Sequence, residues 1–340
     1  MLIASAEKLE LIFKRPAGTS RGVLNTKNSW IIKVWDDTDP QVIGIGEASI
    51  IENLSPEWSD EFPKKITEVI ENINDFAEAP HIKLRKFQSI LFALETALKD
   101  LSTGGKQILF PSDFTSGTDG IKINGLIWMG THEFMLEQIE QKLEEGFSCL
   151  KLKIGAIDFD QELDLLSKIR KRYNADQLEL RVDANGAFKP DDALDKLKIL
   201  ADFHIHSIEQ PIAPKQWNIM AELCQTSPVP IALDEELIGL TEIDEMAQLL
   251  DNVHPQYIIL KPSLIGGFQM ADLWIKLAEE RKIGWWITSA LESNIGLNAI
   301  AQYTYKKNNP MPQGLGTGKL FENNVDTNLI ILGERLYHQP

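Results

Sequence analysis

Six charged or polar residues recur at regular intervals from residue 153 onward in the 340-residue chain, each at the end of a short apolar run. They are Lys153, Asp183, Glu209, Asp234, Lys261 and Ser289, and the intervals are 30, 26, 25, 27 and 28 residues. An interval of this length corresponds to about one strand and one helix. If the apolar runs are parallel strands of a barrel, all six side chains meet at the rim where barrel enzymes carry their catalytic groups.

Three of the six residues are carboxylates, namely Asp183, Glu209 and Asp234. Crowded together in a site of low dielectric, they would repel one another severely unless a cation held them. A ligand set made only of oxygen favours a hard ion, and Mg²⁺ with water or substrate in its shell is the natural choice. The sequence therefore predicts a Mg²⁺ site, in which Mn²⁺ should substitute.

Lysines are expected on both sides of this ion. Lys151 and Lys153 are two residues apart on one strand, so they point the same way, as do Arg181 and Asp183. Lys261 would lie nearly across the barrel. Nearby positive charge should lower the pKa of a lysine, which would let one of them act as a base. A single lysine at a strand end is usually a solvated loop residue, but six residues in register favour catalysis.

The elements that position these residues begin near residue 121, where apolar runs start to alternate with segments of helical period. The runs cover residues 121–127, 149–154, 178–183, 206–209, 229–234, 257–261 and 283–288. This alternation predicts strand–helix units and a parallel sheet. Residues 311–314 would add a short eighth strand and close a (β/α)₈ TIM barrel. Periodicity alone leaves a doubly wound sheet open as the alternative.

The first part of the chain has a different pattern. Residues 1–52 hold β-rich apolar runs, such as 29–35 and 42–47, parted by a turn-like segment, which predicts an antiparallel meander. Residues 58–101 follow with helical spacing. We therefore predict an α+β domain over residues 1–110 and a barrel domain over residues 111–317.

Composition excludes several classes of protein. Acidic residues outnumber basic ones by 50 to 34, and a net charge of -16 argues against nucleic acid or an anionic membrane as a partner. No apolar stretch approaches the ~20 residues of a membrane span, and the N-terminus does not resemble a signal peptide, so we expect a cytoplasmic protein. Cys149 and Cys224 are expected to be buried, reduced thiols.

Five segments resemble the enolase superfamily. They are Lys151-Leu152-Lys153, Arg181-Val182-Asp183-Ala184-Asn185, Ser207-Ile208-Glu209-Gln210-Pro211, Leu233-Asp234-Glu235 and Leu260-Lys261-Pro262. The resemblance implies that a barrel lysine removes the proton beside a substrate carboxylate and that Mg²⁺ stabilises the enediolate. It also implies that the N-terminal α+β domain is a capping domain, completed by residues 318–340.

Within this superfamily, a subgroup with Lys-x-Lys on the second strand includes o-succinylbenzoate synthases, dipeptide epimerases and muconate cycloisomerases. The chain is most similar to the first group, through residues 288–296 and 314–321. The Asp-x-Asp that dipeptide epimerases place after strand eight is missing. The similarity implies dehydration of 2-succinyl-6-hydroxy-2,4-cyclohexadiene-1-carboxylate to o-succinylbenzoate in menaquinone biosynthesis. The alternatives are an epimerase or racemase of dipeptides or N-acylamino acids, and a barrel scaffold without catalysis.

The resemblance also assigns roles. Lys153 would take the proton and then, as an ammonium group, protonate the departing hydroxyl. Lys261 would stay cationic and stabilise the enediolate, while Lys151 would support the charge of Lys153. The small-molecule substrate is a dicarboxylate, and no oligomeric state is implied.

Further residues are expected to bind this substrate. Ser289, Ser293 and Asn294, with the backbone amides near Gly316 and Thr317, suit the second carboxylate. Arg181 would orient Lys153 or close over the site. Ser20 and Arg21 lie between two glycines, and their segment is either a capping loop over the barrel mouth or an ordinary turn.

Overall fold

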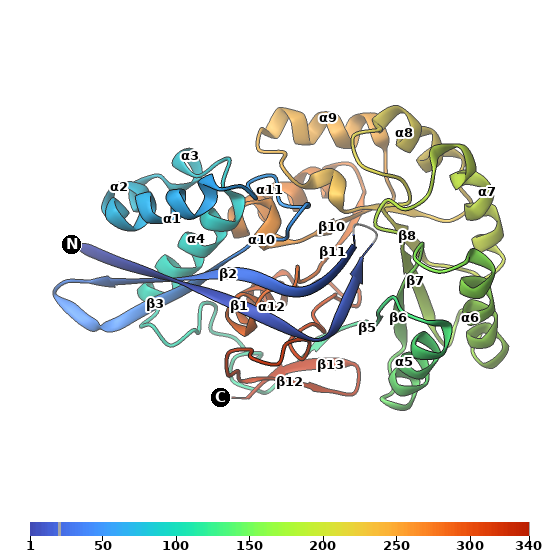
Figure 1. The fold of residues 1–340 in the computed structure, drawn as a ribbon, viewed down its shortest axis with the longest axis horizontal. Helices are drawn as coiled ribbons and strands as arrows, with labels where there is room; N and C mark the ends of the chain where they lie inside the picture. Colours follow the sequence, from blue (N-terminus) through green and yellow to red (C-terminus); the bar gives the residue numbers. More distant parts are fainter. Residues whose placement is uncertain (20–21, 340) are drawn as a thin grey trace.

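A curled sheet of seven parallel strands forms the centre of the protein (Figure 1). The computed structural model describes residues 1–19 and 22–339. Each strand lies beside its neighbour in the chain, in the order β11-β10-β9-β8-β7-β6-β5. Each of the seven predicted apolar runs contains one of them, so an α/β fold is confirmed. The strands are β5 (Gly125–Ile127), β6 (Cys149–Lys153), β7 (Glu179–Asp183), β8 (Ser207–Glu209), β9 (Ile231–Leu233), β10 (Tyr257–Leu260) and β11 (Gly284–Ile287).

Helices connect these strands and cover the outer face of the sheet (Figure 1). The side chains of Thr131 and Asp158 accept hydrogen bonds from backbone amides in the first turns of two of them, which fixes where these helices begin. The elements are α5 (His132–Glu144), α6 (Phe159–Arg172), α7 (Pro190–Ala201), α8 (Trp217–Thr226), the 3₁₀ turn η1 (Glu235–Leu237), α9 (Ile243–Val253), α10 (Pro262–Ile265), α11 (Gly267–Glu280) and α12 (Asn294–Lys307).

The predicted eighth strand is reduced to a few hydrogen bonds. The Gly314 amide donates to the carbonyl of Ile287 at 2.9 Å, beside β11. The Gln313 amide donates to the carbonyl of Lys122 at 2.9 Å, just ahead of β5. Single parallel bridges join the same segment to both sides. Residues 313 and 314 thus lie between the two outer strands of the sheet.

The N-terminal region is an antiparallel meander followed by helices, as predicted. The order is β1-β2-β3, and α4 packs against β3. Gly44 and Gly46 make this packing possible, since a Cβ atom at either would lie 2.0 or 1.9 Å from a backbone oxygen of α4. The elements are β1 (Leu2–Thr19), β2 (Gly22–Asp36), β3 (Asp39–Ser49), α1 (Glu61–Glu71), α2 (Ile73–Glu78), α3 (Pro80–Lys83) and α4 (Gln88–Ser102).

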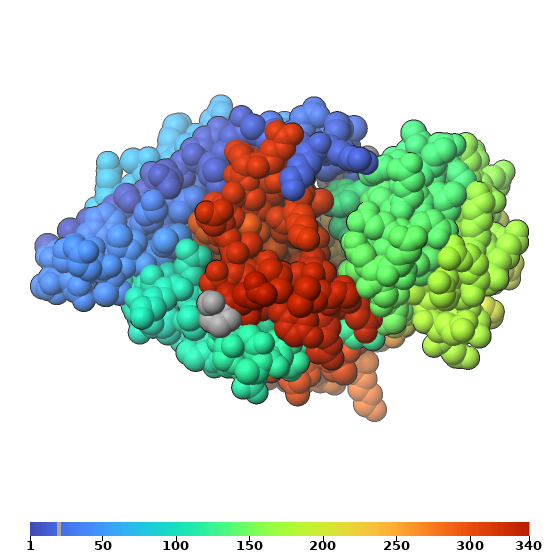
Figure 2. All heavy atoms as spheres, turned by 90° about the horizontal axis from the view of Figure 1, so that it is seen from below, coloured from blue at the N-terminus to red at the C-terminus, as the bar shows by residue number. Residues whose placement is uncertain are grey.

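The C-terminal residues return to both parts of the protein. The Glu322 amide donates to the carbonyl of Ile12 in β1 at 2.8 Å. The hairpin β12 (Leu329–Leu332) and β13 (Arg335–His338) instead joins β4 (Ile121–Lys122), at the start of the parallel sheet. Figure 2 shows these residues, in red, between the blue N-terminal region and the green helices.

The cysteines and the helices also bear on predictions made from the sequence. Cys149 and Cys224 are buried and free of disulfides, as expected. Among the described residues, no helix combines the length and the apolar character that crossing a membrane requires.

A buried carboxyl group in the N-terminal region should make stability depend on pH. Glu57 accepts a hydrogen bond from the Ser89 amide of α4 at 2.9 Å, and burial raises its pKa from 4.5 to about 7. The folded state therefore binds this proton more tightly than the unfolded state, so the free energy of unfolding falls as pH rises through this window. Between pH 5 and pH 8, the free energy of unfolding should fall by about 2 kcal/mol less in Glu57→Gln than in wild type.

Urea denaturation at the two pH values measures this difference. Exposed Glu61, in the first turn of α1, provides the matched control, and Glu61→Gln should keep the wild-type pH dependence. An unchanged pH dependence in Glu57→Gln would show that the proton is not held there.

Candidate active site

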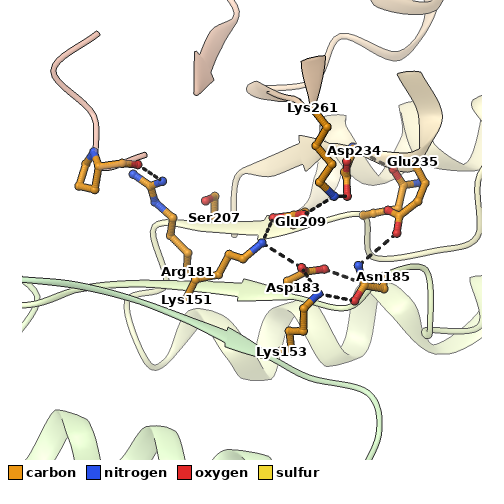
Figure 3. Close-up of polar contacts among 12 residues, drawn as sticks. Lys151, Lys153, Arg181, Asp183, Asn185, Ser207, Glu209, Asp234, Glu235 and Lys261 are labelled. Atoms are coloured by element: carbon orange, nitrogen blue, oxygen red, sulfur yellow. Dashed lines mark hydrogen bonds and ion pairs between the residues drawn. The ribbon is translucent and has the colours of Figure 1, made fainter. Parts of the chain in front are cut away.

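The predicted residues converge because the parallel strands are in register. Lys153 of β6 pairs with Asp183 of β7, and Asp183 pairs with Glu209 of β8. Asp234 and Lys261 follow directly after β9 and β10. Figure 3 shows these lysines and carboxylates pointing toward one another from successive strands. The side chains predicted at these strand ends therefore lie in one cluster.

Three ammonium groups lie among three buried carboxylates. Lys151 Nζ is 3.0 Å from Asp183 Oδ2 and 2.7 Å from Glu209 Oε2. Lys153 Nζ is 2.9 Å from the same Asp183 oxygen. Lys261 Nζ bonds Asp234 Oδ2 and lies 3.7 Å from Glu209 Oε1. The lysines therefore compensate the charge of the carboxylates, which are at most 2% exposed.

The two aspartates respond differently to this environment. Burial alone would raise the pKa of Asp183, but the ammonium groups of Lys151 and Lys153 outweigh it and hold that pKa well below its usual range. Burial raises the pKa of Asp234 well above its usual range, because Lys261 opposes the effect only in part and Glu235 repels the charge. Additional positive charge beside Asp234 would therefore favour its ionised form.

The lysine pKa values correct one prediction from sequence. Burial would lower the pKa values of Lys151 and Lys261, but the carboxylates that they contact outweigh it and raise both. A lowered lysine pKa was expected on the assumption that a cation held the carboxylates. In the structure the ammonium groups contact these carboxylates directly, and the shift is reversed.

The donor chemistry of the site fits a hard divalent cation. All three carboxylates offer oxygen ligands, and Glu209 Oε1 is buried without a hydrogen-bond partner. In residues 1–19 and 22–339, no group of three or more His, Cys, Asp or Glu side chains is arranged to hold a metal ion. In Figure 3 the lysine ammonium groups lie between the carboxylates.

A cavity of about 80 Å³ lies over this cluster. Its polar lining includes Ser289 and Thr317, whose hydroxyl oxygens are 2.6 Å apart. The backbone of Gly316 also borders the cavity. The Trp128 ring, whose centre is 5.7 Å from Lys153 Nζ, forms part of the apolar wall. The other apolar residues of the wall are Leu24, Ile51, Leu54, Leu126, Ala290 and Leu291.

Asn185 lines the cavity, and the sequence predicted no role for it. Lys153 Nζ donates a hydrogen bond to Asn185 Oδ1 at 2.8 Å, and Asn185 Nδ2 donates to Glu235 Oε1 at 3.1 Å. Its position two residues after Asp183, just past the end of the same strand, could have indicated that it lies near the cluster. Trp128 carried no such signal, because an aromatic residue after a strand is usually part of the core.

Ser293 and Asn294 lie outside the cavity. Ser293 begins α12, and its hydroxyl accepts from the Ile295 amide at 3.2 Å while it donates to Glu47. Asn294 Nδ2 donates to the carbonyl of Val325 at 2.5 Å. Both residues therefore hold the helix start in place, and neither is among the described residues that line the cavity.

Arg181 also lies away from the site, and Ser20 and Arg21 fall outside the described residues. Arg181 donates from Nε to Glu179 at 2.7 Å and from Nη1 to the carbonyl of Pro312 at 2.9 Å. Its guanidinium points away from the lysines in Figure 3. The alternation of β7 places Arg181 on the inner face, but its long side chain extends toward the opposite end of the sheet, so it neither orients Lys153 nor closes over the site.

Comparison with known proteins gives relatives over the whole chain. Residues 135–328 match the family model described as enolase C-terminal domain-like. The chain is 51% identical to the o-succinylbenzoate synthase of Desulfotalea psychrophila, over 97% of each protein.

Solved structures give the same result for the fold. The crystal structure of MenC from Desulfotalea psychrophila has a TM-score of 0.86 and 45% identity, and the match covers 99% of both chains. A dipeptide epimerase from Cytophaga hutchinsonii, solved with Mg and the dipeptide D-Ala-L-Val, has a TM-score of 0.84 at 21% identity. That match covers 100% of this chain and 93% of the epimerase, and it shows a shared fold.

Proposed function

Because this chain belongs to the enolase C-terminal domain-like family, we propose that its lysine–carboxylate cluster removes a proton from the carbon beside a substrate carboxylate. The substrate is 2-succinyl-6-hydroxy-2,4-cyclohexadiene-1-carboxylate, and the products are o-succinylbenzoate and water, in menaquinone biosynthesis. Similarity to an o-succinylbenzoate synthase over nearly the whole chain supports this choice. The observation that carries the proposal is the presence of two lysines in one carboxylate cluster, with Lys153 beside Asp183 and Lys261 beside Asp234 and Glu209.

Lys153 moves the proton. In its neutral form, Nζ accepts the proton from the carbon beside the carboxylate, and the resulting ammonium group passes a proton to the departing hydroxyl, which leaves as water. Asn185, which bonds Lys153 Nζ at 2.8 Å, orients this group. Lys261 remains an ammonium group and stabilises the negative charge that develops on the substrate, while Lys151 sustains the electrostatic environment of Lys153.

Asp183, Glu209 and Asp234 are the residues that would hold Mg²⁺. The ion would supply electrophilic stabilisation of the substrate carboxylate. The ammonium groups of Lys151, Lys153 and Lys261 contact these carboxylate oxygens, so they would have to move aside to free the ligands.

The segment at residues 313 and 314 completes the architecture in this proposal. It would act as the eighth strand of a closed (β/α)₈ barrel, since its amides donate to backbone carbonyls near both outer strands. Closure would bring Gly316 and Thr317, which follow it, to the same rim as Ser289. This arrangement is supported by the 2.6 Å contact between the Ser289 and Thr317 hydroxyls.

The cavity suits a dicarboxylate better than a dipeptide. The hydroxyls of Ser289 and Thr317 can donate to a carboxylate, and residues 314–320 include no acidic side chain to hold an ammonium group. The apolar wall with Trp128 and Leu291 suits a cyclohexadiene ring. The second carboxylate of the succinyl group is therefore the part that Ser289 and Thr317 would bind.

Substrate discrimination tests this function. We expect kcat/KM for the cyclohexadiene substrate to exceed that for L-Ala-L-Glu by about 10³-fold or more, because a dipeptide ammonium group would be buried without an anionic partner. Both substrates are assayed side by side in the same Mg²⁺ buffer. A preference for the dipeptide would overturn the substrate assignment and leave the proposed lysine roles in place.

A further inference from the structure

A buried polar network lies where the N-terminal sheet meets the parallel sheet. Lys27, Ser29, Glu47 and Ser49 share one face of the N-terminal sheet, because Ser29 pairs with Ser49 and Ile31 pairs with Glu47. These four polar residues are at most 5% exposed. The proposed chemistry uses none of them, so their burial requires a separate explanation.

Glu47 accepts hydrogen bonds from both parts of the protein. From its own sheet it accepts the hydroxyl of Ser29 at 2.6 Å. From the start of α12 it accepts the Ser293 amide at 2.8 Å, the Ser293 hydroxyl at 2.5 Å and the Gly296 amide at 3.0 Å. Lys27 Nζ donates to the Ser29 hydroxyl at 3.2 Å, which extends the network one residue further. A carboxylate of the N-terminal sheet thus binds the first turn of a helix of the parallel-sheet domain.

Glu47 and Glu292 together leave no room for a side chain at position 296. A Cβ atom there would lie 2.9 Å from Glu47 Oε2 and 2.8 Å from Glu292 Cβ. Glu292 is itself fully buried, and it accepts the Ser263 hydroxyl and the Ala290 amide, the latter at 2.8 Å. Glu292 thus links residue 290 to Ser263, which stands two residues after Lys261 in the chain.

The loop between these contacts forms part of the cavity wall. Ser289, Ala290 and Leu291 line the cavity. Leu291 has a φ angle of 66°, which is unusual for a leucine and persists only where the surrounding structure imposes it. The Ser289 amide is bound to the carbonyl of Gly314 at 3.0 Å on one side, and Glu47 binds Ser293 on the other.

We propose that Glu47 is a positioning residue that holds residues 289–293 in the shape that binds substrate. The N-terminal sheet then sets substrate affinity through a contact that does not touch the substrate. Lys27 and Ser29 support Glu47 from behind. This inference rests on the proposed function for its kinetic readout, but the conformation of the loop can be measured without turnover.

Glu47→Gln tests the proposal with little change in shape. A glutamine amide nitrogen cannot accept hydrogen bonds, so at least one of the donors at Ser293 and Gly296 loses its partner. We expect KM to rise about tenfold while kcat changes less than about threefold, because the wall of the cavity is affected and Lys153 is not. Backbone amides of residues 290–296 should exchange with deuterium about tenfold faster, as measured by mass spectrometry.

Glu95→Gln is the matched control. Glu95 belongs to α4 and accepts the Phe268 and Gln269 amides at the start of α11, at 2.5 and 3.1 Å. It therefore also joins the N-terminal region to a helix of the other domain, but away from the cavity. This variant should keep the wild-type KM and the wild-type exchange rate of residues 290–296. Equal increases of KM in both variants would show that general docking is responsible and would overturn the proposal.

Ser29→Ala provides a milder variant if Glu47→Gln does not fold. It removes one of the four donors and should raise KM by a smaller factor, about twofold to threefold. Unchanged KM and unchanged exchange in a folded Glu47→Gln protein would also overturn the proposal. If wild type does not convert the cyclohexadiene substrate, the proposed function fails, and the exchange rates of residues 290–296 alone decide whether Glu47 positions the loop.

Discussion

Replacement of Lys153 by alanine is expected to lower kcat for the dehydration by about 10²–10⁴-fold, the usual contribution of a positioned acid–base group. Among the described lysines that line the cavity, Lys151 contacts Glu209, and Lys261 contacts both Glu209 and Asp234. Lys153 contacts neither of these two carboxylates. It is therefore the lysine freest to reach a substrate. Formation of the aromatic product, followed by absorbance in Mg²⁺ buffer, measures the loss.

The same variant should remain folded and should still bind the product. Asp183 keeps its contact with Lys151 at 3.0 Å, so no buried charge is left uncompensated when Lys153 is removed. Lys168→Ala, on the exposed side of α6, serves as the control and should have wild-type kcat. Wild-type turnover in a folded Lys153→Ala protein would refute the role of this residue.

The strand ends were predictable because two regularities agree. A βα unit repeats at nearly constant length, and alternation along a strand determines which residues share a face. For Lys153 and Asp183 these rules give both the edge of the sheet and the side, and the structure pairs the two residues directly. The parallel sheet and the N-terminal meander followed from the same local patterns, since both depend on residues near in sequence.

Alternation gives the face of a strand but not the reach of a side chain. Arg181 is on the inner face of β7, as predicted, yet its guanidinium bonds Glu179 and the carbonyl of Pro312. Ser293 and Asn294 were expected at the substrate because both can donate hydrogen bonds. Instead, the Ser293 hydroxyl accepts a hydrogen bond from an amide in the first turn of α12, where such amides lack helical partners. The Asn294 side chain donates to a carbonyl of a neighbouring loop.

Contacts between the domains could not be predicted from local pattern. Because side chains alternate between the two faces of a strand, the sequence shows that Glu47 points to the opposite face from Gly44 and Gly46. Its partner Ser293, however, is 246 residues away in the chain. The direct contacts between lysines and carboxylates were missed for a similar reason, since the sequence shows that the charges converge but not which pairs form.

Chelation of divalent ions is expected to reduce turnover by about 10³-fold or more while the protein remains folded. Electrophilic stabilisation by a metal ion is worth several kcal/mol in the transition state. The fold does not need the ion to balance its charges, since Lys151, Lys153 and Lys261 contact Asp183, Glu209 and Asp234 directly. Circular dichroism with EDTA should therefore match the untreated spectrum, and added Mg²⁺ or Mn²⁺ should restore turnover.

The matched pair Glu209→Gln and Glu236→Gln separates a metal ligand from an ordinary buried carboxylate. In Glu209→Gln, Lys151 and Lys261 retain Asp183 and Asp234, so the fold should persist, but one anionic oxygen ligand is lost and calorimetry should show Mg²⁺ affinity reduced by about tenfold or more. Glu236 is also buried, but it accepts the Lys215 amide at 2.6 Å and lies outside the cluster. Glu236→Gln should therefore bind Mg²⁺ as wild type does. Equal Mg²⁺ affinity in the two variants, or full turnover by protein shown by elemental analysis to be metal-free, would contradict the assignment of these carboxylates as ligands.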